Sequence, residues 1–203
     1  MDVLLEKAPL SAGVLYRLLS GSVCPRPIAW VATQDKRGNA NLAPFSFFNV
    51  ASIDPPVLAF SPLLDGSAQP KDTLRNLNEV EECVVHVGTE GLIEALNTTS
   101  ASLPRGEDEF VLAGLEKAAM PGVSVPRIAA APVAFGCKLV DVIRFGDRPL
   151  AGSLVLVQVV AIHADDSVWD GRHVNMEILQ PIGRLAGSDY VRITDRFSIE
   201  RPA

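Results

Sequence analysis

Polar side chains that can bind an anion gather in the first half of this 203-residue chain. Lys71, Asp72 and Thr73 form a compact Lys-Asp-Thr turn. Ser46 and Ser61 precede it, each in or at the end of an apolar run. A cation and hydroxyl groups give a phosphate charge-assisted hydrogen bonds. Because the apolar runs are rich in strand-forming residues, the pattern predicts a barrel wall with a groove for a flat, phosphorylated ligand.

Aromatic and amide side chains in the same region can hold the ring of such a ligand. Trp30, Phe45 and Phe47 offer apolar surfaces, and Asn49 offers an amide. With the anion-binding groups above, they match what flavin mononucleotide (FMN) needs for its ring and its phosphate. The competing interpretation is structural: the aromatic residues pack in the core, and the Lys-Asp-Thr turn is the solvent-exposed start of a helix.

The chain offers no strong catalytic group of its own. It has neither a G-x-S-x-G motif nor a glycine-rich nucleotide loop. Its three histidines lack the spacing of metal ligands, and its three cysteines form no C-x-x-C pair. We therefore predict no metal site, reduced thiols and a structural His86, with Cys24 the one thiol near the groove. Such a chain suits an enzyme whose cofactor performs the chemistry.

The composition argues against several classes of partner. The net charge is −6 and the pI is about 5.1, whereas nucleic acid requires a basic face. No apolar run approaches the roughly 20 residues of a membrane span. The N-terminus carries acidic residues where an export signal carries basic ones. We expect one domain over residues 1–203, in a cytoplasmic protein that binds neither nucleic acid nor membrane.

Short apolar runs separated by turns predict a β-barrel with few helices. The first two strands form a hairpin with a turn at Gly38-Asn39, and the third returns beside them. Residues 14–21 fit either a short helix or the first strand, and residues 98–127 form a long excursion. The predicted elements are a lead-in at 1–13, strands at 28–33, 45–52, 57–61, 83–87, 133–142 and 153–164, and helices at 71–78 (capped by Asp72), 89–97 and about 107–113.

Seven short motifs follow one another along the chain. They are PRPIAWVAT at 25–33, NLAPFSFFNVASIDPP at 41–56, LAFSP at 58–62, KDTLRN at 71–76, DEF at 108–110, GL at 114–115 and PIGRLAGSDYVR at 181–192. In this order they resemble the flavin reductase-like, FMN-binding split-barrel family, and most closely its flavoredoxin-like branch. The second motif is the most specific, and the resemblance covers residues 15–195.

The resemblance implies a Greek-key split barrel with a few peripheral α-helices. It also implies a homodimer that holds two FMN molecules at or near the subunit interface. The site residues that it implies are Trp30 beside the ring; Phe45, Ser46 and Asn49 near the ring and ribityl chain; Ser61, Lys71 and Thr73 at the phosphate; and Arg184 and Tyr190 near the cofactor or the substrate entrance.

One departure from the family pattern affects the expected activity. Reductases of two-component monooxygenases often carry Gly-Asp-His before the last long strand, where this chain has Gly146-Asp147-Arg148. Arg148 replaces a titratable ring with a fixed cation. This change alters how a nicotinamide would dock, and it suits an anionic donor such as NADPH better than NADH.

The leading hypothesis is an FMN-dependent oxidoreductase that takes electrons from NADH or NADPH and passes them to a second flavin, a small acceptor or a redox partner protein. The Arg148 substitution motivates an alternative, a flavoredoxin-like electron carrier that a partner protein reduces. A third possibility is a non-catalytic split barrel that binds another cofactor, such as haem held by His86 or His163.

Overall fold

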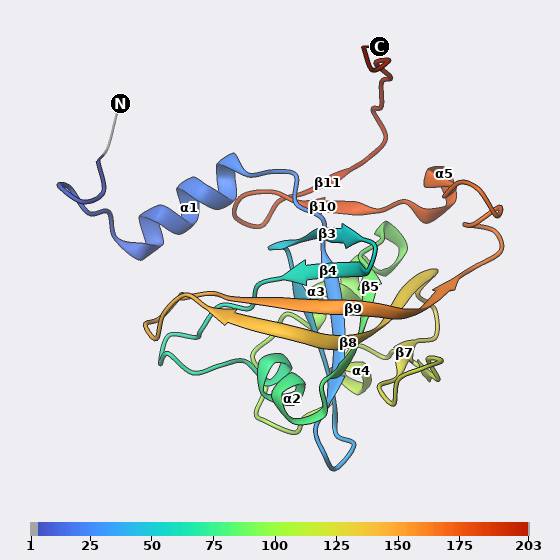
Figure 1. Ribbon diagram of the computed structural model, residues 1–203, viewed down its shortest axis with the longest axis horizontal. Helices are drawn as coiled ribbons and strands as arrows, with labels where there is room; N and C mark the ends of the chain where they lie inside the picture. The colour runs from blue at the N-terminus through green and yellow to red at the C-terminus, as the bar shows by residue number, and fades with distance from the viewer. Residues whose placement is uncertain (1–3, 203) are drawn as a thin grey trace.

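The computed structural model describes residues 4–202, which fold around one large antiparallel sheet (Figure 1). The strand order is β2-β1-β5-β8-β9-β4-β3. The prediction of a mainly β fold with few helices is confirmed. The strands are β1 Ala29–Gln34, β2 Ala40–Phe45, β3 Phe48–Ile53, β4 Pro56–Phe60, β5 Glu82–Val87, β8 Val133–Arg144 and β9 Ser153–Ala164.

The sheet curls until its first and last strands approach each other. β2 and β3 are the two edges of the sheet, yet only Ser46 and Phe47 separate them in sequence. A link of two residues spans about 10 Å at most. Because it joins the two edges, the sheet must roll into a barrel. The Ser61 N–H donates to the Phe47 carbonyl at 2.8 Å and fixes the link against the end of β4.

The strand predicted at 45–52 is wrong in both its bounds and its partner. Phe45 ends β2, which pairs with β1, whereas Phe48–Ile53 form β3, which pairs with β4. The strand predicted at 57–61 therefore lies between β3 and β9 and not beside β1. The sequence hides the break because both sides of the link are rich in strand-forming residues.

The turn between β1 and β2 is longer than the predicted Gly38-Asn39 pair. The Asp35 carboxylate organises it by accepting the backbone N–H groups of Arg37 and Asn39, each at 2.9 Å, and the Asn39 side-chain amide at 2.8 Å. These hydrogen bonds, led by that of the Asn39 side chain, lower the pKa of Asp35. Gly38 has a φ of +85°, which glycine adopts without strain.

The ambiguous segment at 14–21 is helical. It forms α1, Ala12–Ser22, whose N-cap Ser11 accepts a first-turn N–H at 3.4 Å. Figure 1 shows α1 at one end of the molecule, near the small β10–β11 sheet of Ile182–Arg184 and Tyr190–Arg192. Within residues 4–202, no helix has the length and apolar character needed to cross a membrane.

β1 is buried on both faces and therefore contributes to two core clusters. Alternate residues of a strand point to opposite faces. Ala29 and Val31 pack inside the barrel with Phe60 of β4, whereas Trp30 and Ala32 pack on the outer face. The interior is shared by strands from both halves of the sheet, so it holds the barrel together.

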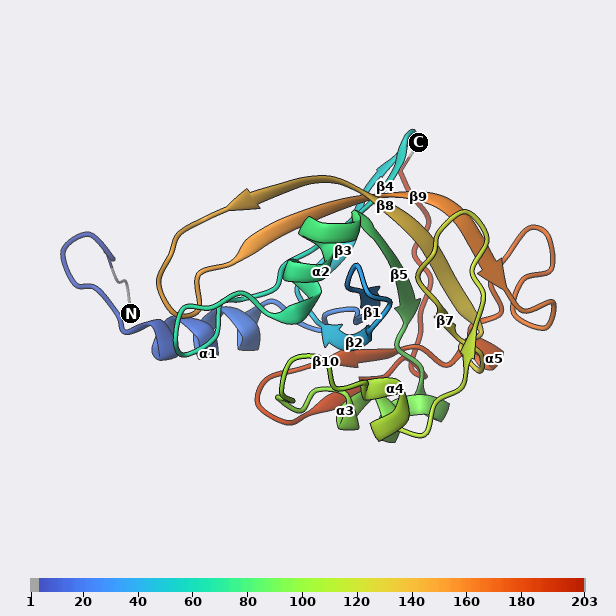
Figure 2. The same cartoon turned by 90° about the horizontal axis from the view of Figure 1, so that it is seen from below.

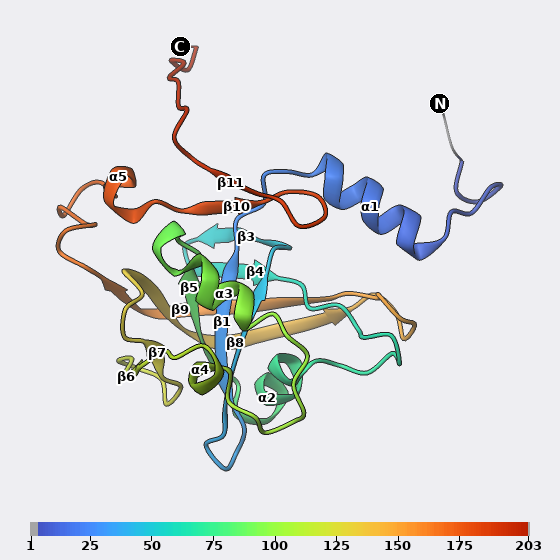
Figure 3. The ribbon, with the colours of Figure 1, turned by 180° about the vertical axis from the view of Figure 1, so that it is seen from behind.

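The predicted excursion at 98–127 covers the outer face of the barrel. Phe110, Met120 and Val125 are buried in the outer cluster. Figure 3 shows α3 (Ile93–Thr98) and α4 (Glu109–Leu112) on that side, in front of β1 and β5. The helices predicted at 89–97 and about 107–113 are present, with shifted ends. The elements here are the 3-10 helix Glu90–Leu92, α3 Ile93–Thr98, α4 Glu109–Leu112, β6 Lys117–Ala118 and β7 Arg127–Ile128, and α5 Met176–Leu179 follows β9.

His86 on β5 is fully buried, and each of its two ring nitrogens makes a hydrogen bond with a backbone group. Its Nδ1 lies 2.8 Å from the Trp30 carbonyl, and the Ile128 N–H donates to its Nε2 at 2.9 Å. A carbonyl only accepts and an N–H only donates, so the ring is neutral with its proton on Nδ1. Burial lowers the pKa of His86 to about 4. This supports the structural role and leaves no ring nitrogen for a haem iron.

We expect the buried His86 to make the protein less stable in acid. The pKa of His86 is about 4 in the folded state, against about 6.5 in the unfolded chain, so between these values the unfolded state binds more protons. Stability is therefore lost as the pH falls below about 6.5, and the His86 contribution reaches about 3 kcal/mol at pH 4. Urea unfolding between pH 4 and 7 measures this slope, which His86→Gln should reduce. An unchanged slope in the variant would assign the acid sensitivity to other groups.

Candidate functional site

A polar pocket of about 250 Å³ lies at the start of α2, Asp72–Val80. Its walls come from β2, the start of α2 and the segment after α3, which Figures 2 and 3 show near α2. The wall carries three cations, three carboxylates and four hydroxyl groups. The charged residues are Asp65, Lys71, Asp72, Arg75, Arg105 and Glu109, and the hydroxyl-bearing residues are Thr73, Thr99, Ser100 and Ser102.

The predicted helix after Lys71 is present, but Asp72 does not cap it. Lys71 is the N-cap and its side chain makes no cap bond, and within residues 4–202 no side chain is hydrogen-bonded to the free N–H groups of the first turn. The Asp72 carboxylate instead pairs with Arg75 at 3.4 Å and with Arg105 at 3.5 Å. The free amides and the partial positive charge of the helix start favour an anion here.

A buried polar network forms the floor of the polar pocket. Thr73 is almost fully buried, and its hydroxyl accepts the Asn41 side-chain amide at 3.0 Å. That amide also reaches Thr33 at 3.3 Å, and the Asn76 amide reaches Thr33 at 3.2 Å. These bonds join β1, β2 and α2, so they fix the start of α2 against the barrel. Among the residues that the structure describes, none accepts a hydrogen bond from the Thr73 hydroxyl, so its proton can serve a bound ligand.

Trp30 lies behind the pocket wall and not in it. Its indole N–H donates to the Thr99 hydroxyl at 2.8 Å, and its side chain is fully buried. Trp30 therefore packs in the core, and its ring has no exposed surface that a flavin could contact. Its contribution is to fix Thr99, which does line the pocket.

Glu109 is a buried carboxylate on the pocket wall that sequence reasoning missed. One of its oxygens accepts the N–H of Leu42 on the edge strand β2 at 2.9 Å. Burial raises the pKa of Glu109. This bond anchors the segment that carries Ser100, Ser102 and Arg105 to the barrel edge.

A second, apolar pocket of about 450 Å³ lies between α1 and the tip of the β8–β9 hairpin. Tyr16 and Phe47 pack with their ring centroids 6.4 Å apart on one wall. Phe145 and the exposed Arg148 come from the hairpin tip. The loop after β4 borders both pockets: Leu63 lines the apolar one, whereas Asp65, Pro70 and Lys71 line the polar one.

Several predicted site residues lie outside both pockets. Phe45 is buried against Phe60, with a centroid distance of 5.5 Å, and the Lys71 ammonium lies 5.9 Å from its ring. Ser46 accepts the Arg26 Nε–H at 3.3 Å. Ser61 is half-buried beside Phe47, Asn49 is exposed on β3, and Arg184 lies 4.4 Å from the Tyr190 ring on the β10–β11 pair.

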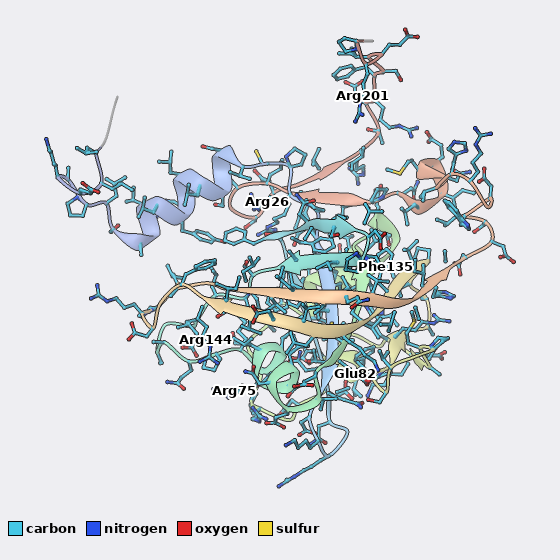
Figure 4. All side chains as sticks on the ribbon, in the orientation of Figure 1. Arg26, Arg75, Glu82, Phe135, Arg144 and Arg201 are labelled. Carbon is cyan, nitrogen blue, oxygen red and sulfur yellow. The ribbon has the colours of Figure 1, made fainter. Side chains whose placement is uncertain are left out.

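The structure thus brings together Lys71 and Thr73 at the polar pocket and leaves Arg148 at the apolar one. Two cations of the polar pocket, Arg75 and Arg105, were missed. Figure 4 marks Arg75 beside α2. Arg75 follows Asp72 at helical spacing, a signal that could have found it. Arg105 lies in an irregular segment without such a signal. The part of the chain that the structure describes contains no metal-binding cluster of His, Cys, Asp and Glu.

Comparison with known proteins supplies the family. The family model described as flavin reductase like domain matches residues 20–175. An uncharacterised protein of Bacillus subtilis is 43% identical over 198 residues, with 96% of each chain covered. The crystal structure of nitrilotriacetate monooxygenase component B from Bacillus cereus has a TM-score of 0.92 at 34% identity and covers 98% of both chains.

A further solved structure is similar over nearly its whole length. The 2-nitrobenzoate 2-nitroreductase of Pseudomonas fluorescens has a TM-score of 0.87 at 32% identity, covering 100% of this chain and 96% of that one. Flavoredoxin of Desulfovibrio vulgaris, at 16% identity and a TM-score of 0.71, shares the fold. The predicted split barrel is confirmed by these neighbours. This chain belongs to the flavin reductase-like family of oxidoreductases.

Proposed function

We propose that this protein binds FMN and uses it as an NAD(P)H-dependent oxidoreductase. One observation carries the proposal: the loop after β4 borders two pockets, one rich in cations and hydroxyl groups and the other larger and apolar. A ligand with a phosphate at one end and a flat ring at the other matches this pair of pockets.

The residues of the polar pocket fit the phosphate of FMN. Lys71, Arg75 and Arg105 supply positive charge, and Ser100 and Ser102 supply hydroxyl groups. The first turn of α2 adds backbone N–H groups that no side chain caps. We therefore assign the phosphate to this pocket. Arg75 and Arg105 take the place of Ser61 among the proposed phosphate ligands.

The apolar pocket fits the ring system. Tyr16, Phe47 and Phe145 give it an apolar, aromatic lining, and Arg148 is also among its lining residues. Bound FMN would supply the redox chemistry, taking a hydride from a reduced nicotinamide and giving electrons to an acceptor. The residues of this chain would hold the ring, and the Arg148 guanidinium would suit the additional phosphate of NADPH.

Anaerobic mixing with NADH and with NADPH tests this function. Purified protein loaded with FMN should lose its flavin absorbance at about 450 nm within seconds of mixing, faster with NADPH than with NADH. Bleaching by neither donor, but by a partner reductase, would favour the electron-carrier alternative. A protein that binds no FMN would overturn the proposal.

We further propose that the protein is a homodimer. Leu18 and Leu19 on α1 and Val23 at its C-cap are exposed, as are Val50 and Ile53 on the edge strand β3. Exposed apolar surface of this extent is typical of an interface between subunits. Light scattering after size exclusion should give twice the chain mass of 21.7 kDa. A monomer at micromolar concentration would contradict the proposal.

A further inference from the structure

We infer that Asp72 is a built-in competitor of the bound phosphate, an inference that rests on the proposed FMN site. Its carboxylate already pairs with two of the three cations in the polar pocket. Asp72 Oδ1 lies 3.4 Å from Arg75 Nη1 and 3.5 Å from Arg105 Nη1. A phosphate that binds these guanidinium groups must share them with a carboxylate of the protein or displace it.

The charges that line the polar pocket support this interpretation. Three cations face three carboxylates, so the pocket is nearly neutral before a ligand arrives. Two of the carboxylates have backbone partners: Glu109 accepts the Leu42 N–H at 2.9 Å, and Asp65 accepts two N–H groups of its own loop at 2.8 Å. Asp72 instead has arginines as its partners, so it is the carboxylate that opposes an incoming anion.

The position of Asp72 keeps it close to any phosphate at the helix start. It is the first residue of α2, the helix whose uncapped N–H groups would contact that phosphate. Its side chain is 25% exposed, and those of Arg75 and Arg105 are 34% and 43% exposed. Solvent therefore weakens the repulsion without abolishing it, and removing the charge should tighten phosphate binding by roughly tenfold.

This arrangement would favour exchange of the flavin over permanent retention. A fully cationic pocket would hold FMN tightly, whereas a pocket that contains its own counter-ion returns to a stable, paired state when FMN leaves. Asp72 would thus set the residence time of the cofactor and allow FMN to act as a substrate that enters and leaves.

The test is the affinity of Asp72→Asn for FMN and for riboflavin, measured by equilibrium titration. Asparagine keeps the shape of the side chain and removes its charge. We expect FMN to bind roughly tenfold more tightly, riboflavin to be unchanged, and inorganic phosphate to become a stronger competitor of FMN. Glu79→Gln is the matched control because Glu79 pairs with Arg105 at 3.2 Å from outside the pocket. Its effect should be small.

The possible outcomes separate this inference from the proposed function. If the wild-type protein binds FMN but Asp72→Asn leaves the affinity unchanged or lowers it, Asp72 positions the arginines and the inference is wrong. Equal tightening by Glu79→Gln would also overturn it, since release of Arg105 alone would then explain the effect. A wild-type protein that binds neither FMN nor phosphate would overturn the proposed function and the inference with it.

Discussion

Replacing Lys71 and Arg105 together with alanine is expected to weaken FMN binding by about a hundredfold or more and to leave riboflavin binding within about twofold of the wild type. Both cations line the polar pocket. A hydrogen bond to a charged group contributes about 1.5–3 kcal/mol, and each 1.4 kcal/mol changes the dissociation constant about tenfold. Riboflavin has the same ring without the phosphate, so titration with both ligands isolates the phosphate contribution.

A control variant separates local contacts from overall charge. Lys138→Ala with Arg201→Ala removes the same charge at exposed positions outside both pockets. We expect it to bind FMN with nearly wild-type affinity. If the control lost as much affinity as the pocket variant, or if riboflavin weakened in parallel with FMN, the phosphate would not lie in the polar pocket.

Arg26→Met is expected to lower the free energy of unfolding by about 3–4 kcal/mol. Arg26 is 6% exposed, and no carboxylate of residues 4–202 pairs with it. Its guanidinium donates to the carbonyls of Ser20 and Val23 at the end of α1, and to that of Leu185 at 3.0 Å. Figure 4 marks it between α1 and β10. Methionine fills similar space but leaves these carbonyls without a donor.

Thermal and urea unfolding measure this effect. The melting temperature should fall by roughly 10 °C, given about 2–4 °C per kcal/mol for a chain of this size. Arg196→Met is the control, because Arg196 is exposed and its pairing with Glu177 contributes little. A stability loss no larger than that of the control would show that α1 is held by its apolar contacts alone.

The long strands could be predicted because their residue types match the buried, extended positions that they occupy. β8 and β9 are continuous runs rich in β-branched residues, and the structure pairs them almost along their whole length. The segment 45–53 misled the prediction for the same reason. A strand-forming sequence does not show where the chain leaves one sheet edge for the other, because that break depends on how the sheet closes.

The candidate site was only partly predictable. Lys71 and Thr73 were found because a compact polar turn stands out against apolar runs. Trp30 was placed beside the ring, since sequence alone cannot distinguish a ring that lines a groove from one that packs behind it. Arg105 was missed because it reaches the pocket through tertiary contacts, the ion pairs with Asp72 and Glu79.

A crystal structure of the protein with FMN tests the central claim most directly. The account predicts phosphate oxygens within hydrogen-bond distance of Lys71 and of at least one of Arg75 and Arg105, at the start of α2, with the ring extending toward Phe47. A phosphate bound elsewhere, with Asp72 still paired with Arg75 and Arg105, would contradict it.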